Sequence, residues 1–85
     1  MEQHLRHLLD EVSAAIGRTK RHEDREELAR LQGEVEQHLE VDDGEEKHSG
    51  LKDTLEKAEI RFETDHPSLG SALRQTIEVL SAAGI

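Results

Sequence analysis

Cysteine, tryptophan and tyrosine are absent from this 85-residue sequence, which has one proline and one aromatic residue, Phe62. The lack of cysteine excludes disulfide bonds and every zinc site that uses cysteine ligands. No run of apolar residues approaches the roughly 18 that a membrane-spanning helix needs. The first 11 residues are charged throughout and lack the apolar core of a signal peptide. We therefore expect a cytoplasmic protein with no membrane partner.

Apolar residues are scarce and acidic residues are abundant. Leu, Ile, Val and Phe together number 20 of 85, and 20 acidic residues oppose 11 basic ones, a net charge of −9. The negative charge argues against a nucleic acid as partner, because its phosphates would be repelled. We expect one small domain, residues 1–85, and so few apolar residues predict only a marginal core in a single chain. The prediction is therefore a homo-oligomer, with a dimer favoured, in which a second copy covers apolar surface.

Apolar residues recur at helical spacing in four segments. The predicted fold class is all-α: a helical hairpin followed by a helix that is broken or kinked at Pro67, associating as a helical bundle or coiled-coil-like dimer. The predicted helices are residues 2–16, 23–40, 49–64 and 67–83. A linker is expected at 41–50, where two glycines and a charge cluster replace apolar residues. Ser49 would cap the helix that follows.

Two glycines bear on how the helices are built. Gly33 lies inside the second predicted helix, where it is expected to face solvent and be tolerated; the alternative is that it admits a second backbone. Gly84 is expected to adopt the left-handed conformation that ends the last helix. Ile85 would then contact Leu80 in a Schellman motif.

Pro67 interrupts two apolar runs that share a period. Proline is favoured at the first position of a helix, where its missing N–H would be unpaired anyway. The residue before a proline is pushed out of the helical region, so one helix should end near residue 65 and the next begin near 67. The apolar face keeps its angular phase across the break, and a sharp corner and a single kinked helix fit equally well. Both geometries predict an arm projecting from the first hairpin rather than a simple up-down four-helix bundle.

Two groups of titratable residues were considered for catalysis or metal binding. His4, His7 and Glu11 could share a helix face with metal-ligand spacing, but no fourth ligand is implied and surface residues are the favoured interpretation. Asp65 and His66 are adjacent and could transfer a proton. A helix cap is the favoured interpretation of that pair, because catalysis would also need a nucleophile or polarised site held in a cleft.

Two weaker signals concern anions and charge. The predicted helix start at residues 66–71 has free N–H groups that could receive an anion, and Gly70 would permit close approach. Ser68 and Ser71 lie nearby without the strand–turn context of a nucleophile. Residues 23–50 hold 11 acidic and 3 basic side chains, which fits a solvated face better than mimicry of a nucleic acid.

The C-terminal run RFETDHPSLGSALRQTIEVLSAAGI resembles the signature of a family of short bacterial proteins, the domain-of-unknown-function family numbered 4404. A Phe-Glu pair, a His-Pro pair, a following Leu and a closing Gly-Ile are typical of that family. The corresponding residues here are Phe62, Glu63, His66, Pro67, Leu69, Gly84 and Ile85. The N-terminal pattern LRHLLDEV and the acidic middle match more loosely. The resemblance implies a small helical protein with no assigned activity, and it transfers no catalytic residue.

The leading functional hypothesis is a non-enzymatic protein that self-associates and acts as a protein–protein interaction module. The motif residues then have structural roles at the corner and the last turn, and no catalytic, cofactor-binding or metal-binding residue is predicted. One alternative is a small metal-binding or catalytic protein that uses His66 and Asp65. Another is an acidic regulator that binds a basic surface on a partner.

Overall fold

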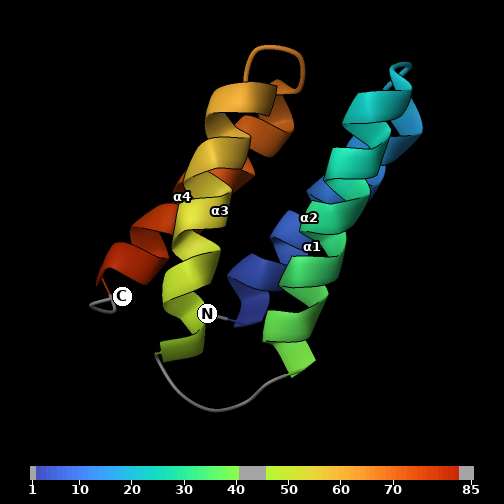
Figure 1. The fold of residues 1–85 in the computed structure, drawn as a ribbon. Coiled ribbons are helices and arrows are strands. Elements are labelled where there is room, and N and C mark those ends of the chain that lie inside the picture. Colours follow the sequence, from blue (N-terminus) through green and yellow to red (C-terminus); the bar gives the residue numbers. More distant parts are fainter. Residues whose placement is uncertain (1, 41–45, 83–85) are drawn as a thin grey trace.

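The computed structural model describes residues 2–40 and 46–82 (Figure 1). Within these ranges the chain forms only α-helices and the turns between them, which confirms the predicted all-α class. The helices are α1 (Glu2–Arg18), α2 (His22–Glu40), α3 (Glu46–Phe62) and α4 (Pro67–Ala82). None of them is long and apolar enough to cross a membrane.

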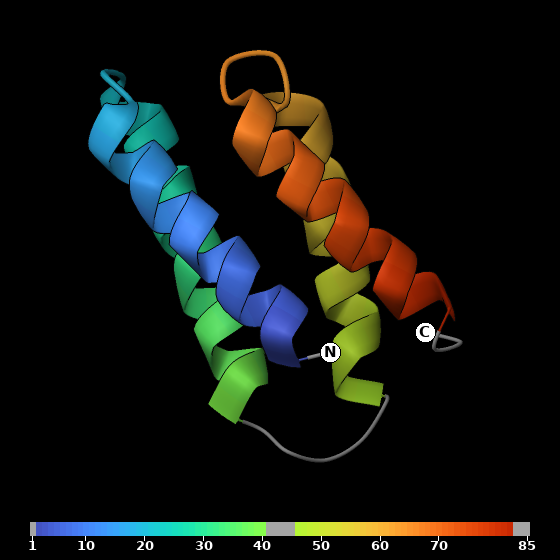
Figure 2. The same ribbon diagram turned by 180° about the vertical axis from the view of Figure 1, so that it is seen from behind.

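The helices pack as two antiparallel hairpins, α1 with α2 and α3 with α4 (Figure 1). From behind, α1 and α4 lie side by side and join the hairpins (Figure 2). Contacts follow the closed order α1–α2–α3–α4–α1, the α2–α3 contact is the least extensive, and the described parts of diagonal helices do not touch. This is an up-down-up-down four-helix bundle. The expectation of a projecting arm is therefore wrong.

The corner between α3 and α4 explains the difference. The α3 helix ends at Phe62, two residues earlier than predicted, so residues 63–66 form a turn long enough to reverse the chain. The His66 N–H donates to the Phe62 carbonyl at 2.8 Å, and the Gly70 N–H donates to the His66 carbonyl at 2.9 Å. Pro67 opens α4, as predicted. Of the two geometries left open, the corner is the one observed.

The core lies on the bundle axis, where the four apolar stripes meet. The buried apolar residues are Leu5, Leu8, Val12, Ala15, Leu28, Leu31, Val35, Leu51, Leu55, Ala58, Phe62, Leu69, Ala72, Leu73 and Leu80. Among the described side chains, Ile60 is the one large hydrophobic that is exposed. The radius of gyration is 12.0 Å, close to the roughly 12 Å expected for a compact 85-residue domain. A single chain thus covers its own stripes, and the prediction that a second copy is needed for this is wrong.

Helix boundaries differ from prediction at two further places. The α1 helix continues through Gly17 to Arg18, because the Thr19 N–H still donates to the Ala15 carbonyl at 2.9 Å. The α3 helix begins at Glu46, so residues 46–50 of the predicted linker are helical and Ser49 is not a cap. Gly50, which was also assigned to the linker, lies within α3 and does not interrupt it.

The two glycine predictions have different outcomes. A Cβ on Gly33 would meet nothing within 4 Å, which confirms that no second backbone approaches it, although the residue is half-buried. The predicted Schellman contact of Gly84 and Ile85 lies outside the described residues.

Candidate functional site

The three residues with metal-ligand spacing, His4, His7 and Glu11, all lie on α1. His4 and His7 are exposed and Glu11 is half-buried. In residues 2–40 and 46–82, no three His, Asp or Glu side chains gather closely enough to hold a metal ion. The helical spacing of these residues is therefore not matched by ligands from a neighbouring helix.

The α3–α4 corner brings together most of the motif residues. Phe62, His66 and Leu69 are buried, and the rings of Phe62 and His66 lie 6.2 Å apart at an interplanar angle of 58°. The backbone carbonyl of His66 accepts the first hydrogen bond of α4, which places His66 at the N-cap position. Asp65 is exposed, and its carboxylate makes no hydrogen bond with the His66 ring. The corner therefore has the packing of a structural turn rather than the geometry of a proton-transfer pair.

The start of α4 is occupied by packing and by acidic neighbours rather than by an open anion site. An ideal Cβ on Gly70 would lie 2.8 Å from the Glu63 Cβ and 3.0 Å from the Glu63 Cα. The close approach that the sequence suggested at Gly70 is therefore made by Glu63, in the turn that follows α3, and not by a ligand. Ser68 and Ser71 are exposed on the outer side of this turn.

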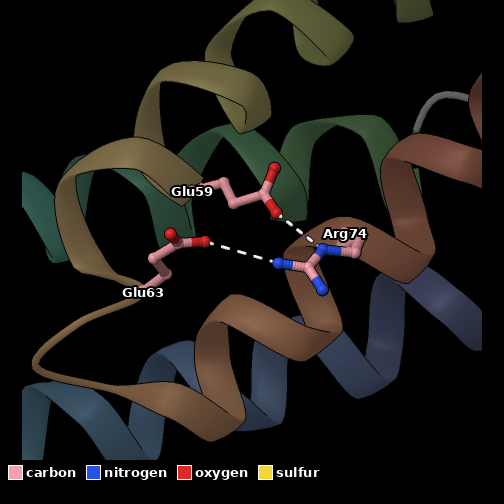
Figure 3. Close-up of polar contacts among 3 residues, drawn as sticks. All are labelled: Glu59, Glu63 and Arg74. Atoms are coloured by element: carbon pink, nitrogen blue, oxygen red, sulfur yellow. Dashed lines mark hydrogen bonds and ion pairs between the residues drawn. The ribbon is translucent and has the colours of Figure 1, made fainter.

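Arg74 links the two helices beside this corner (Figure 3). Its Nε donates to Glu59 Oε2 at 3.0 Å, and its Nη2 lies 3.5 Å from Glu63 Oε2. The hydrogen bond that Arg74 donates to Glu59, followed by the negative charges of Glu59 and Glu63, raises the pKa of Arg74 above its ordinary value. Two carboxylates thus satisfy this cation, and a free anion would meet their repulsion. The cluster was not predictable from the sequence, because residues 15 and 11 positions apart meet only after the corner folds.

A groove lies between α2 and α3 on the described surface. Its volume is about 610 Å³, within the range of sites that hold small ligands or side chains. Its apolar floor is formed by Leu31 of α2 with Ala58 and Phe62 of α3. The groove lies where helix contact is least extensive, and Ala58 is too small to fill the space opposite Leu31. The walls are formed by Glu27, Arg30, Glu34, Thr54, Lys57 and Arg61.

The groove is closed at one end by an ion-pair cluster. Arg61 Nη2 lies 2.9 Å from Asp24 Oδ1, and Arg61 Nε lies 2.8 Å from Glu27 Oε2. Asp24 is the most sheltered of the three, with 13% of its side chain exposed. These pairs hold α2 and α3 together where apolar contact is limited.

The other charged side chains of the groove walls are either exposed or unpaired, so a partner could contact them. Lys57 makes an exposed pair with Asp53, four residues earlier on α3, at 3.3 Å. Arg30 and Glu34 make no ion pair with any described residue. The groove therefore combines an apolar floor with unpaired charges of both signs, which is the arrangement of an interaction surface.

Sequence analysis did not identify this groove. The sequence of α2 does show an apolar stripe of Leu28, Leu31 and Val35 flanked by charges, but this pattern does not indicate which helix faces it.

No curated protein and no solved structure matches the chain. A family model does match, over residues 1–85. The chain therefore belongs to the family described as a domain of unknown function, DUF4404.

Proposed function

We propose that this protein is a non-enzymatic interaction module that self-associates as a dimer through the α2–α3 groove. The observation that carries the proposal is the groove of about 610 Å³ between α2 and α3, where helix contact is least extensive and the buried side chains of Leu31, Ala58 and Phe62 form the floor. Interfaces typically have such an apolar centre with a polar rim. The proposal includes a cytoplasmic location, which the heavily charged composition favours.

Self-association no longer depends on an uncovered core. The bundle buries its stripes within one chain, so a dimer would add contacts between folded monomers rather than complete the fold. Such a dimer should be in reversible equilibrium, because its interface is formed by a groove and one face of a helix. Its dissociation constant should then respond to single surface substitutions.

Catalysis by Asp65 and His66 receives less support. The ring of His66 packs against Phe62, and neither Asp65 nor His66 lines either of the two pockets described on this surface. Catalysis would need a positioned reacting group within hydrogen-bond reach. The arrangement fits a corner that must be rigid.

The direct experiment is sedimentation equilibrium at a series of chain concentrations from about 1 μM to about 1 mM, a range that covers dissociation free energies of about 8 to 4 kcal/mol. The chain mass is 9.6 kDa, and the proposal expects a rising mass that approaches twice this value. A mass that stays at the single-chain value throughout would refute self-association.

A second candidate is a regulator that binds a basic surface, and the charge of α2 favours it. The helix carries seven acidic and two basic side chains over His22–Glu40. Binding of a poly-lysine peptide, measured by titration calorimetry, should then weaken steeply as salt is raised from about 0.05 to 0.5 M, because salt screens exposed charges. Salt-independent binding, or none at low salt, would reject this candidate.

A further inference from the structure

Ile60 lies on the face of α3 that points away from the bundle. Its exposed fraction is 81%, whereas Ala58 and Phe62, two positions before and after it, are buried. Two residues span about 200° of helix, which places Ile60 opposite the core. A single exposed hydrophobic side chain is common in folded proteins. Ile60 bears on function because it lies next to the α2–α3 groove.

The groove and Ile60 lie on adjacent faces of the same helix. Lys57 forms part of the groove wall and is three residues from Ile60, so the two side chains are neighbours on the surface of α3. When a projection and a recess are this close, two copies related by a two-fold axis can each insert the projection into the recess of the other. Both features are then satisfied by one closed dimer.

The size of the groove is sufficient for such an insertion. Its volume of about 610 Å³ is about four times the roughly 150 Å³ of an apolar cavity that accepts benzene. An isoleucine side chain and parts of its neighbours therefore fit above the floor of Leu31, Ala58 and Phe62.

The charges favour the same pairing. The chain has a net charge of −9, so two copies repel each other at long range. The α3 helix is the exception, with four acidic and four basic side chains over Glu46–Phe62. Glu56, one turn before Ile60, makes no ion pair with any described residue. The groove walls carry Arg30, Lys57 and Arg61 together with Glu27 and Glu34. Lys57 and Arg61 already have carboxylate partners, whereas Arg30 makes no ion pair with any described residue, so insertion of Ile60 brings Glu56 to the wall that holds Arg30.

We propose that Ile60 of a second copy of this chain enters the α2–α3 groove, with Glu56 beside Arg30 of the wall, and that the contact is repeated about a two-fold axis. This inference rests on the proposed self-association and identifies its surface. It gives Ile60 and the groove a single shared role.

The test compares Ile60→Lys with the matched control Ala14→Lys. Both positions are exposed in helices and both changes add one positive charge, but Ala14 lies on α1, whose described part does not contact α3. Each dimer loses two buried isoleucine contacts in Ile60→Lys, so its dissociation constant should rise by at least about 100-fold. The control should keep the wild-type dissociation constant. Circular dichroism melts, read at a concentration where both are monomeric, should show that both variants remain folded.

A charge exchange tests the groove wall itself. Arg30→Glu should raise the dissociation constant by about tenfold, because two exposed pairs are lost per dimer. Adding Glu56→Arg to the same chain should restore much of the affinity, since each charge then again faces its opposite. No restoration would overturn the pairing of Glu56 with the groove wall.

The results separate this inference from the function on which it rests. If the wild-type chain forms a dimer that Ile60→Lys disrupts and Ala14→Lys leaves intact, the result supports both self-association and the proposed surface. A wild-type dimer that survives Ile60→Lys overturns the inference and leaves self-association standing. A wild-type chain that stays monomeric at every concentration overturns both.

Discussion

The close approach of α4 to the end of α3 can be tested with a pair of glycine substitutions that should have opposite effects. Gly33→Ala and Gly70→Ala both replace glycine by alanine within a helix, and alanine is favoured there by up to about 1 kcal/mol. A Cβ on Gly33 meets nothing within 4 Å. Gly33→Ala should therefore raise the free energy of unfolding by nearly that amount.

Gly70→Ala meets a steric obstacle that Gly33→Ala does not. The new Cβ would lie 2.8 Å from the Glu63 Cβ and 3.0 Å from the Glu63 Cα. Because one of these atoms belongs to the backbone, the corner must shift, and overpacking of this kind costs about 1–3 kcal/mol. After the helix preference is subtracted, Gly70→Ala should lower the free energy of unfolding by up to about 2 kcal/mol.

Urea denaturation followed by circular dichroism measures both values, at one chain concentration because self-association would shift the transition. The variants should differ by about 1–3 kcal/mol, and each kcal/mol corresponds to about 4–8 °C in melting temperature for a domain of this size. If Gly70→Ala were as stabilising as Gly33→Ala, the tight packing of Gly70 against Glu63 would be refuted.

Three further predictions concern the corner and the α2–α3 contact. Phe62→Ala removes a buried ring and should cost about 3–5 kcal/mol, much of the stability of a small domain, as measured by thermal melting; a loss below about 1 kcal/mol would contradict its burial. His66→Asn should keep the backbone hydrogen bonds that begin α4 but lose the ring contact with Phe62, so thermal melting should show a lower midpoint, while the exposed Asp65→Ala changes stability by less than about 0.5 kcal/mol. If His66→Asn and Asp65→Ala both lowered the stability by a large and similar amount, a coupled Asp–His pair would be indicated instead. Arg61→Met breaks two partly exposed ion pairs and should cost about 1 kcal/mol at low salt and less at about 0.5 M salt; a salt-independent loss in urea titrations would argue that the packing of its stem matters more than its charge.

The sequence alone determined the local structure of this protein. Four helices were identified from the spacing of apolar residues, such as Leu5, Leu8 and Val12 in α1. This was possible because helical periodicity depends on residues only three and four positions apart. Pro67 identified the start of α4 for an equally local reason, its fixed φ and missing N–H. The family was also recognisable from residues 61–85, and the match over the whole chain confirms it.

Only the tertiary structure decided how the helices meet. A corner and a kink at Pro67 have the same apolar phase, and the choice between them comes from the packing of α4 on α1, which are distant in sequence. The count of apolar residues predicted an incomplete core, but it could not show that four narrow stripes converge on one axis and cover one another. The pairing of Arg61 with Asp24 spans 37 positions, and Gly70 proved to contact Glu63 rather than a ligand. Such contacts depend on the summed packing of whole helices, and for that reason the groove and the exposed Ile60 emerge only in three dimensions.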